Sequence, residues 1–369
     1  MTKKIIISSN SSWNIVNFRL GLASCLKEQG YLITIAAPKD QYSPQIESLG
    51  FRFIELNISA RSTNIFQDAL TFLSYIKIFL QVKPDYFLGF TIKPNIWGGL
   101  AARILGINRV LNIAGLGKVF EKENFLNRLV RFLYLLSLSG SKRIFFQNRE
   151  DLSYFHTLGL ISADNVSVLP GSGVNLTKFA FSPIPKTLEQ FHFLFMGRLL
   201  YSKGIKELVE ASKLLHQEYK NFHVSIYGII QNLNDSDAVS EDYLKALDRY
   251  SFIGFYGATD RPSAQIEKTH CVVLPSYYNE GTPKVLLEAC AMGKPIITSD
   301  WKGCRDVVES SSNGYLCEIQ SPESLCDKMK LMIDLTDEGY QKFSKISRKV
   351  AETRYNEELV FNHYIEAID

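Results

Sequence analysis

The sequence has no C-x-x-C cysteine pair, no long apolar run and only six histidines. Its six cysteines are scattered, which favours buried free thiols in a reducing compartment over disulfides or a zinc site. The longest apolar stretch, residues 69–82, contains Lys77 and falls short of the roughly 20 residues that span a membrane. The first residues hold too short an apolar run for a signal peptide. We therefore expect a cytoplasmic protein.

Positive charge is concentrated in the first half of the chain. Residues 1–178 hold 20 Lys and Arg against 11 Asp and Glu, whereas residues 179–369 hold 21 against 27. A basic half suits a phosphorylated ligand or an anionic membrane surface, although random drift of surface charge is an alternative. The basic residues come without an aromatic platform or a known motif for nucleic acid, so we do not expect nucleic-acid binding.

Short apolar runs alternate with amphipathic helical patterns along nearly the whole chain. This alternation predicts an α/β protein with parallel, doubly wound sheets. The segment 169–187, rich in Gly, Ser and Pro, interrupts the pattern and is interpreted as a domain boundary. We predict two Rossmann-like domains, 1–178 and 179–355, that face each other across a cleft. The predicted strands are 4–8, 31–36, 51–56, 85–90, 110–114, 143–147 and 166–169, followed by 191–196, 222–227, 252–255, 271–275, 295–299 and 314–317.

The segment GRLLYSKG, residues 197–204, follows a predicted strand and opens a helix. Gly197 lets the backbone approach a ligand closely, Arg198 and Lys203 flank the turn, and Gly204 begins a helix with free amides. An arginine fork, a compact ammonium group and a positive helix end together suit a diphosphate. Surface cations on a solvated loop are the alternative.

A second motif, NEGTPKVLLEACAMGK, contains two glutamates eight residues apart. Thr282 and Pro283 are predicted as the N-cap and first residue of a helix, with Glu280 just before it and Glu288 in its second turn. We infer that Glu280 accepts hydrogen bonds from sugar hydroxyls and Glu288 from ribose hydroxyls, about 10 Å apart. The motif predicts a nucleotide-sugar site. Its donor-binding residues are Gly197, Gly281, Thr282, Pro283, Lys284, Val285 and Glu288.

These two motifs and GSGVNLTKF, residues 171–179, resemble the family 4 retaining glycosyltransferases of the two-domain GT-B fold. The resemblance implies that Arg198 and Lys203 stabilise the departing nucleoside diphosphate without a metal or other cofactor, and that Glu280 contacts the donor sugar. It implies that the anomeric configuration is retained without a protein nucleophile, although Glu280 as the nucleophile stays an alternative. It also implies that the last helix, 356–369, crosses back to the N-terminal domain.

The N-terminal half departs from the family pattern, because SSNSSWNIVNFRLGL replaces a glycine-rich turn and no histidine falls at a strand end. A histidine-assisted step is therefore not expected. The segments 8–22, 89–104 and 111–120 resemble a subgroup that extends undecaprenyl-diphosphate-linked sugars in surface-polysaccharide, O-antigen or glycan assembly. This resemblance implies an N-acetylhexosamine donor such as UDP-GalNAc or UDP-GlcNAc. The predicted acceptor-binding residues are Arg19, Lys93, Asn95, Gly115, Gly117 and Lys118.

Two further features allow alternative interpretations. Residues 120–143 mix apolar and basic residues like an interfacial helix, which predicts peripheral contact with the inner face of the cytoplasmic membrane. Asp235 and Asp237 form a D-x-D pair that could hold a metal, but we interpret it as a solvated loop. The rival functions are a UDP-sugar 2-epimerase of GT-B architecture and a non-catalytic sugar-binding protein.

Overall fold

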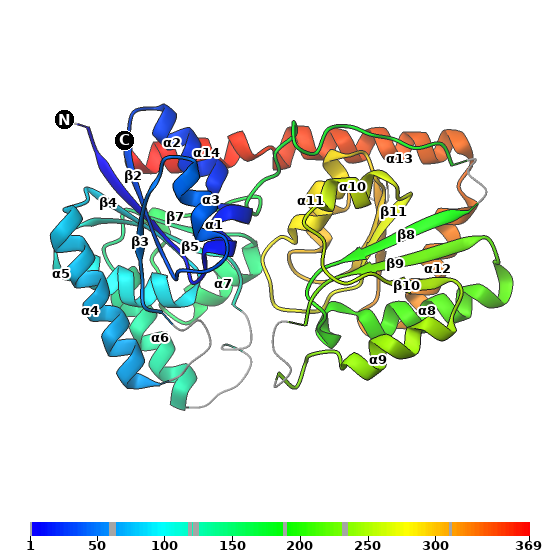
Figure 1. The fold of residues 1–369 in the computed structure, drawn as a ribbon, viewed down its shortest axis with the longest axis horizontal. Helices are drawn as coiled ribbons and strands as arrows, with labels where there is room; N and C mark the ends of the chain where they lie inside the picture. The colour runs from blue at the N-terminus through cyan, green and yellow to red at the C-terminus, as the bar shows by residue number, and fades with distance from the viewer. Residues whose placement is uncertain are drawn as a thin grey trace. The chain divides into compact units, whose positions relative to one another are not determined.

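The computed structural model describes residues 2–58, 64–116, 120, 125–186, 190–230, 235–309 and 312–369. The chain forms two compact units (Figure 1). The N-terminal unit comprises Met1–Ser172 and Glu357–Asp369, and the C-terminal unit comprises Gly173–Asn356. The last helix therefore belongs to the first unit, as the resemblance to GT-B proteins implied.

The N-terminal unit is built on a seven-stranded sheet of order β3-β2-β1-β4-β5-β6-β7, in which all neighbours are parallel. Its strands are β1 (Lys4–Ser8), β2 (Leu32–Ala37), β3 (Arg52–Glu55), β4 (Tyr86–Phe90), β5 (Asn108–Ile113), β6 (Arg143–Phe146) and β7 (Val166–Val168). The C-terminal unit holds a six-stranded parallel sheet of order β10-β9-β8-β11-β12-β13. Its strands are β8 (Phe191–Met196), β9 (Phe222–Tyr227), β10 (Ile253–Phe255), β11 (Cys271–Leu274), β12 (Ile296–Ser299) and β13 (Gly314–Cys317).

Helices cover both faces of each sheet. In the N-terminal unit they are α1 (Ser12–Phe18), α2 (Leu20–Glu28), α3 (Ser43–Ser48), α4 (Ile65–Val82), α5 (Gly99–Ile104), α6 (Phe125–Leu138), α7 (Arg149–Thr157) and α14 (Glu357–Ile368). In the C-terminal unit they are α8 (Ile205–Glu218), α9 (Glu241–Lys245), α10 (Pro262–Glu267), α11 (Lys284–Ala291), α12 (Pro322–Asp334) and α13 (Asp337–Val350). Short π or 3-10 turns are η1 (Pro94–Gly98), η3 (Ala163–Asn165), η4 (Tyr201–Lys203), η5 (Ala246–Arg249), η6 (Arg305–Val307) and η7 (Ala351–Tyr355).

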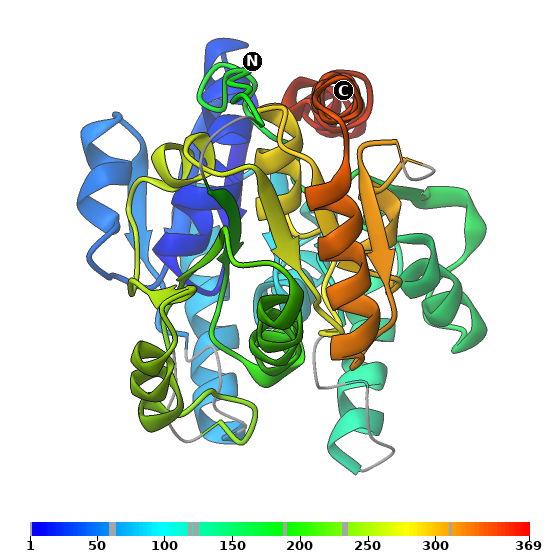
Figure 2. The ribbon, with the colours of Figure 1, turned by 90° about the vertical axis from the view of Figure 1, so that its right-hand side faces the viewer.

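The helix pairs follow from the apolar cores. On one face of the first sheet, α1, α2, α3 and α14 share a buried core, and on the other face α4, α5, α6 and α7 share a second one. In the second unit α8 packs on α12, and α11 packs on α13 (Figure 2). Because both faces are covered, central strands such as β4 and β11 are buried along their whole length. All the predicted strands are present, with ends shifted by at most two residues.

Each sheet has one point where the strand order reverses. In the first sheet it lies between β1 and β4, and in the second between β8 and β11. Ligands of open parallel sheets bind beyond the carboxyl ends of the strands at such a point. The loops that follow these four strands carry most of the residues singled out by the sequence.

Candidate functional site

The loop after β8 brings Lys203 to the strand-order reversal of the C-terminal unit. Residues Tyr201–Lys203 form a 3-10 turn, and Gly204 follows in the left-handed region at φ +80 as the N-cap of α8. A Cβ at position 204 would collide with the carbonyl oxygen of Pro275, just beyond β11. Only glycine therefore lets the start of α8 lie against the end of β11.

Lys203 and Glu280 form an ion pair at this point. Lys203 is buried, and its Nζ contacts Glu280 Oε1, which also accepts a hydrogen bond from Ser276 Oγ at 3.1 Å. The guanidinium of Arg198 lies 4.7 Å from the centre of the Tyr278 ring, and Lys203 Nζ lies 5.4 Å from it. The three predicted catalytic residues, Arg198, Lys203 and Glu280, are therefore gathered around one tyrosine. No pattern in the sequence selected Tyr278, although it stands two residues before Glu280.

Two glycines near this cluster, Gly303 and Gly197, differ in whether packing within the unit leaves room for a side chain. A Cβ at Gly303, which has φ +76, would strike the carbonyl oxygen of Gly281, so this glycine lets the loop after β12 support the Glu280 segment. A Cβ at Gly197 would meet no atom closer than 3.8 Å. Packing within the unit therefore does not require glycine at position 197, which fits close approach of a ligand.

The D-x-D pair supports the Lys203 turn rather than lying in a solvated loop, so that interpretation was wrong. Asp237 Oδ1 accepts a hydrogen bond from the amide of Ser202 at 3.0 Å, and Oδ2 accepts one from its hydroxyl at 2.5 Å. Asp235 in turn accepts a bond from the amide of Asp237 at 3.0 Å. Among the residues described, no group of three or more His, Cys, Asp or Glu side chains is arranged to hold a metal ion.

Helix α11 starts later than predicted. Pro283, not Thr282, is the N-cap, and it makes no side-chain capping bond, so the helix begins at Lys284. Because Pro283 has ψ 120, it is extended rather than helical and cannot be the first helical residue. Gly281, Thr282 and Pro283 are buried, while Lys284 and Val285 are half-buried.

Glu288 is a buried carboxyl group in α11, as the sequence predicted. Burial raises its pKa above the ordinary value to about 7, and the charges of Lys284 and Lys178 oppose this shift. A carboxyl group with this pKa is about half ionised at neutral pH. It can change its charge when a ligand arrives.

The predicted acceptor residues of the N-terminal unit differ in what they contact. Lys93 Nζ pairs with Asp68 Oδ1 of α4 at 2.6 Å. Asn95 Nδ2 donates to the carbonyl of Asn112 on β5 at 2.7 Å. Gly115 has φ +115, a conformation that favours glycine. Gly117 and Lys118 lie outside the described residues.

Arg19 lies between α1 and α2 and is 4% exposed. Its guanidinium stacks over the ring of Phe90, the last residue of β4, at 4.1 Å. Its Nε is shut off from solvent and has no hydrogen-bond partner in the described part of the chain. Arg19 therefore stands at the strand-order reversal of the first sheet.

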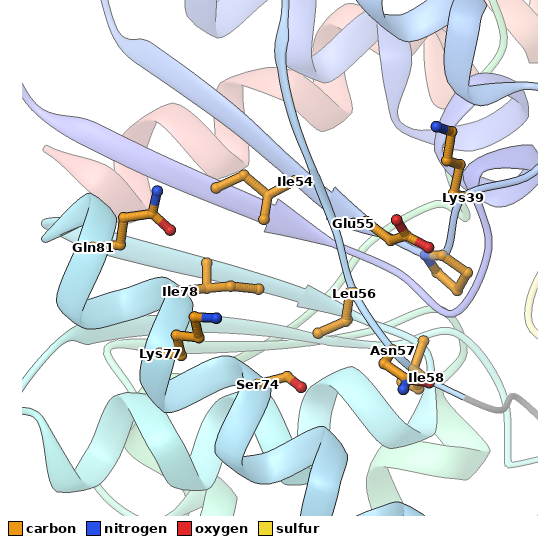
Figure 3. Close-up of a pocket in the computed structure, with 11 residues that line it drawn as sticks. Lys39, Ile54, Glu55, Leu56, Asn57, Ile58, Ser74, Lys77, Ile78 and Gln81 are labelled. Carbon is orange, nitrogen blue, oxygen red and sulfur yellow. The ribbon is translucent and has the colours of Figure 1, made fainter.

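A groove of about 590 Å³ lies between α4 and the residues around the carboxyl ends of β2 and β3 (Figure 3). Ile54, Leu56, Ile58 and Ile78 supply apolar lining, and Lys39 and Lys77 are exposed cations at its sides. No sequence pattern indicated this groove, since its lining comes from three separate segments.

Helix α4 presents a stripe of exposed apolar side chains, which we call the α4 stripe. Phe66 is 82% exposed, Leu70 54%, and Leu73 and Leu80 are each 58% exposed. Their spacing places them on one face of the helix, together with Lys77. The neighbouring helices add exposed Ile104 from α5 and Phe132 and Leu135 from α6.

The interfacial helix predicted within 120–143 corresponds to α6 and is only partly exposed. Phe132 is exposed, but Leu129, Leu133 and Leu136 are half-buried, and the side chain of Phe125 lies outside the described residues. No helix in the described part of the chain is long and apolar enough to cross a membrane.

Histidines 192, 223 and 270 lie at the amino-terminal ends of their strands, away from the ligand-binding edge.

Two family models match the chain. Residues 4–148 match "Glycosyl transferase 4-like", and residues 177–350 match "Glycosyl transferases group 1". A relative of 26% identity over 379 residues is N,N'-diacetylbacillosaminyl-diphospho-undecaprenol alpha-1,3-N-acetylgalactosaminyltransferase of Campylobacter jejuni, with 98% of this chain and 97% of the relative covered. UDP-Gal:alpha-D-GlcNAc-diphosphoundecaprenol alpha-1,3-galactosyltransferase of Escherichia coli is 25% identical over 288 residues, with 74% and 73% covered.

Solved structures share the fold over the whole chain. A glycosyltransferase from Rickettsia africae aligns with a TM-score of 0.82 at 17% identity, covering 100% of this chain and 98% of that one. Anabaena Alr3699/HepE in complex with UDP-glucose aligns with a TM-score of 0.80 at 15% identity, covering 99% of each chain. The chain belongs to the glycosyltransferases of GT-B fold, with a glycosyl transferase 4-like N-terminal domain and a group 1 C-terminal domain.

Proposed function

We propose that this glycosyltransferase moves an N-acetylhexosamine, GalNAc or GlcNAc, from a UDP-sugar to a hydroxyl of a lipid-diphosphate-linked saccharide. The observation that carries the proposal is the gathering of Arg198, Lys203 and Glu280 around Tyr278, at the strand-order reversal of the second sheet. The relatives from Campylobacter and Escherichia coli are named for diphospho-undecaprenol acceptors. Their names support an acceptor of this class in surface-polysaccharide or glycan assembly.

In the proposed reaction the bond between the anomeric carbon of the donor and the β-phosphate oxygen breaks. The acceptor oxygen forms a new bond to that carbon on the same face, and its proton passes to the departing phosphate. Negative charge grows on the leaving diphosphate, where Arg198 and Lys203 stabilise it. The two cations supply this charge without a metal ion, so none is required.

The other donor contacts follow from the same loops. Glu280, held by Ser276 and Lys203, accepts hydrogen bonds from the sugar hydroxyls. Glu288 accepts hydrogen bonds from the ribose hydroxyls. Because residue 197 is a glycine, the donor can approach the backbone closely at this position. The segment Gly281–Val285 lies along the diphosphate.

We also propose that the N-terminal unit rests on the membrane that carries the acceptor. The α4 stripe provides apolar side chains, with Lys77 among them and the groove of Figure 3 beside it. An amphipathic surface of this kind inserts its apolar side chains at the headgroup boundary while its cations attract anionic lipids. This surface complements α6, the helix selected from the sequence.

The test is to incubate the protein with a panel of UDP-sugars and a short-chain lipid-diphosphate saccharide, and to measure the masses of the products by mass spectrometry. We expect a gain of one N-acetylhexosamine from one UDP donor, undiminished in a chelator. NMR of the product should show that the anomeric configuration of the donor is kept. A product with a different added mass would show that another sugar is transferred. An inverted anomeric configuration would reject the proposed stereochemistry. Activity that is lost in chelator and restored by Mn²⁺ would reject the metal-free mechanism. A UDP-sugar isomer formed without acceptor would reject the transferase.

A further inference from the structure

Arg19 is a buried cation whose hydrogen bonds are missing. Only 4% of the residue is exposed, and its Nε is shut off from solvent without a partner. Buried charges in proteins are paired and hydrogen-bonded, because a guanidinium that leaves water loses its solvation. Among the described residues nothing forms an ion pair or a side-chain hydrogen bond with Arg19. Stacking on Phe90 at 4.1 Å recovers only part of that loss.

A second buried arginine of the same unit shows what a structural role requires. Arg109 is 6% exposed, and its Nη2 donates to the carbonyl of Ser139 at 2.8 Å while its Nε donates to Ser141 Oγ at 3.5 Å. The protein therefore satisfies Arg109 from its own chain. Arg19 has the same burial without the same partners.

The surroundings of Arg19 hold it in place but do not neutralise it. Tyr364 of α14 is fully buried, its ring lies 5.8 Å from that of Phe90, and its hydroxyl accepts a hydrogen bond from Asn112 Nδ2 at 2.6 Å. Gly21, two residues after Arg19, lies so close to α14 that a Cβ would come within 2.8 Å of the Phe361 ring. The last helix of the chain thus packs against the segment that carries Arg19.

We propose that Arg19 binds a phosphoryl group of the acceptor diphosphate, and that Phe90 and Tyr364 position it for this contact. Arginine presents forked donors that match phosphate oxygens and stays charged when buried. The contact lies at the carboxyl end of β4, beside the strand-order reversal where open sheets bind ligands. Of the predicted acceptor residues whose side chains the structure describes, Lys93 and Asn95 already contact Asp68 and Asn112, whereas Arg19 has no such polar contact among the described residues. The assignment to the acceptor rests on the proposed function, but the anion site does not.

The anion site is tested with inorganic pyrophosphate and three variants, all in a Lys203→Met background that weakens the competing cation site. Arg19→Met removes the buried charge and keeps much of the side chain's bulk. We expect it to melt no lower than its parent without ligand, and to lose most of the rise in Tm that pyrophosphate gives. Arg109→Met, the matched control, should melt several degrees lower and keep that rise. Arg19→Lys should retain part of the rise.

The outcomes separate the anion site from the acceptor assignment. If Arg19→Met lowers the Tm as Arg109→Met does and pyrophosphate still stabilises it, Arg19 is structural and the proposal is wrong. In the otherwise unaltered protein, Arg19→Met should raise the KM for the lipid-diphosphate acceptor about tenfold or more, with the KM for the UDP-sugar unchanged. A rise in the KM for the UDP-sugar instead would assign the phosphoryl group to the donor and overturn the acceptor assignment. If the parent protein forms no product but Arg19 still controls the pyrophosphate response, the anion site stands and the proposed function fails.

Tyr364→Phe tests the positioning role. It keeps the ring and removes only the hydroxyl, so the acceptor KM should rise severalfold, less than in Arg19→Met. Asn112→Ala removes the hydrogen bond to that hydroxyl from the other side and should have a similar effect. An unchanged acceptor KM in both variants would reject the role of Tyr364.

Discussion

A buried cation lies at the strand-order reversal of each sheet, but the two cations differ in whether a described residue pairs with them. In the C-terminal unit Lys203 is buried and already paired with Glu280, whereas in the N-terminal unit Arg19 is buried and no described residue forms an ion pair or a side-chain hydrogen bond with it. Each sheet therefore places positive charge where its ligand is expected, but among the residues that the structure describes this charge is balanced in the second unit and not in the first. In the proposed sites the donor would share Lys203 with Glu280, whereas an anion would supply the partner that Arg19 lacks among the described residues.

The largest expected effect is at Lys203. Lys203→Met should lower kcat/KM by about 10² to 10³, because it removes a cation placed where charge develops on the leaving group. The measurement is the initial rate of sugar transfer at several donor concentrations. Lys213→Met is the matched control, since Lys213 forms an ion pair with Glu210 on the same helix α8 and lies outside the cluster. A rate within threefold of the unaltered protein would remove Lys203 from the mechanism.

Glu280 should come next. Glu280→Gln keeps the size of the side chain but removes its charge, and turnover should fall at least tenfold because the sugar hydroxyls lose a charged acceptor. Combining it with Lys203→Met should cost less than the product of the two single losses, because the two residues contact each other. Kinetics of the two single variants and the double variant measure this. Fully multiplicative losses would show that the ion pair has no part in donor binding.

The pH dependence of donor binding should reveal Glu288. If ribose hydroxyls bind its ionised form, a pKa of about 7 predicts that UDP-hexose affinity rises about tenfold between pH 6 and pH 8. Calorimetric titration with a UDP-hexose measures this, and the intact nucleotide sugar avoids the second ionisation of free UDP. In Glu288→Gln the dependence should flatten. A similar slope in that variant would assign the titration to another group.

The same group affects stability with a definite sign. Burial raises the pKa of Glu288 above its ordinary value, so the folded state binds the proton more tightly than the unfolded state. The corresponding contribution to the free energy of unfolding is complete below about pH 4 and is lost as pH rises to about 7. Urea unfolding of Glu288→Gln should show less loss over this range. Parallel curves for the two proteins would contradict this.

The smallest effect is expected at the membrane surface. Leu73→Glu in the α4 stripe should reduce binding to anionic vesicles about threefold or more, because it places a charge in an apolar contact. Co-sedimentation with phosphatidylglycerol vesicles measures this. Leu331→Glu on α12 is the control, since Leu331 is also an exposed leucine, 47% against 58% for Leu73. Equal binding by the two variants would show that the α4 stripe is not the membrane-binding face.

Local patterns predicted the fold well and the site in part. The apolar runs predicted every strand, and the central strands gave the clearest signal because a strand buried on both faces must be apolar throughout. The two motifs also selected Arg198, Lys203 and Glu280, which the structure brings together. The ion pair between Lys203 and Glu280 was not predicted, because the two residues are 77 positions apart in the sequence.

Other features depended on packing that a local pattern does not contain. Asp237 stabilises the Lys203 turn only because its loop folds back onto that turn. Thr282 precedes a proline and looks like an N-cap, but the chain stays extended through Pro283. The apolar stretch 69–82 was identified only as too short to span a membrane, and only the fold shows which of its side chains remain exposed.

We propose that cations at the end of β8 hold the nucleoside diphosphate, and a titration with UDP and uridine measures their contribution. The affinities of UDP and uridine are compared in the unaltered protein and in Arg198→Met, with a chelator present throughout. The account predicts that UDP binds at least a hundredfold more tightly than uridine, and that this ratio falls at least tenfold in Arg198→Met. Equal affinities for UDP and uridine, or a ratio that Arg198→Met leaves unchanged, would contradict it.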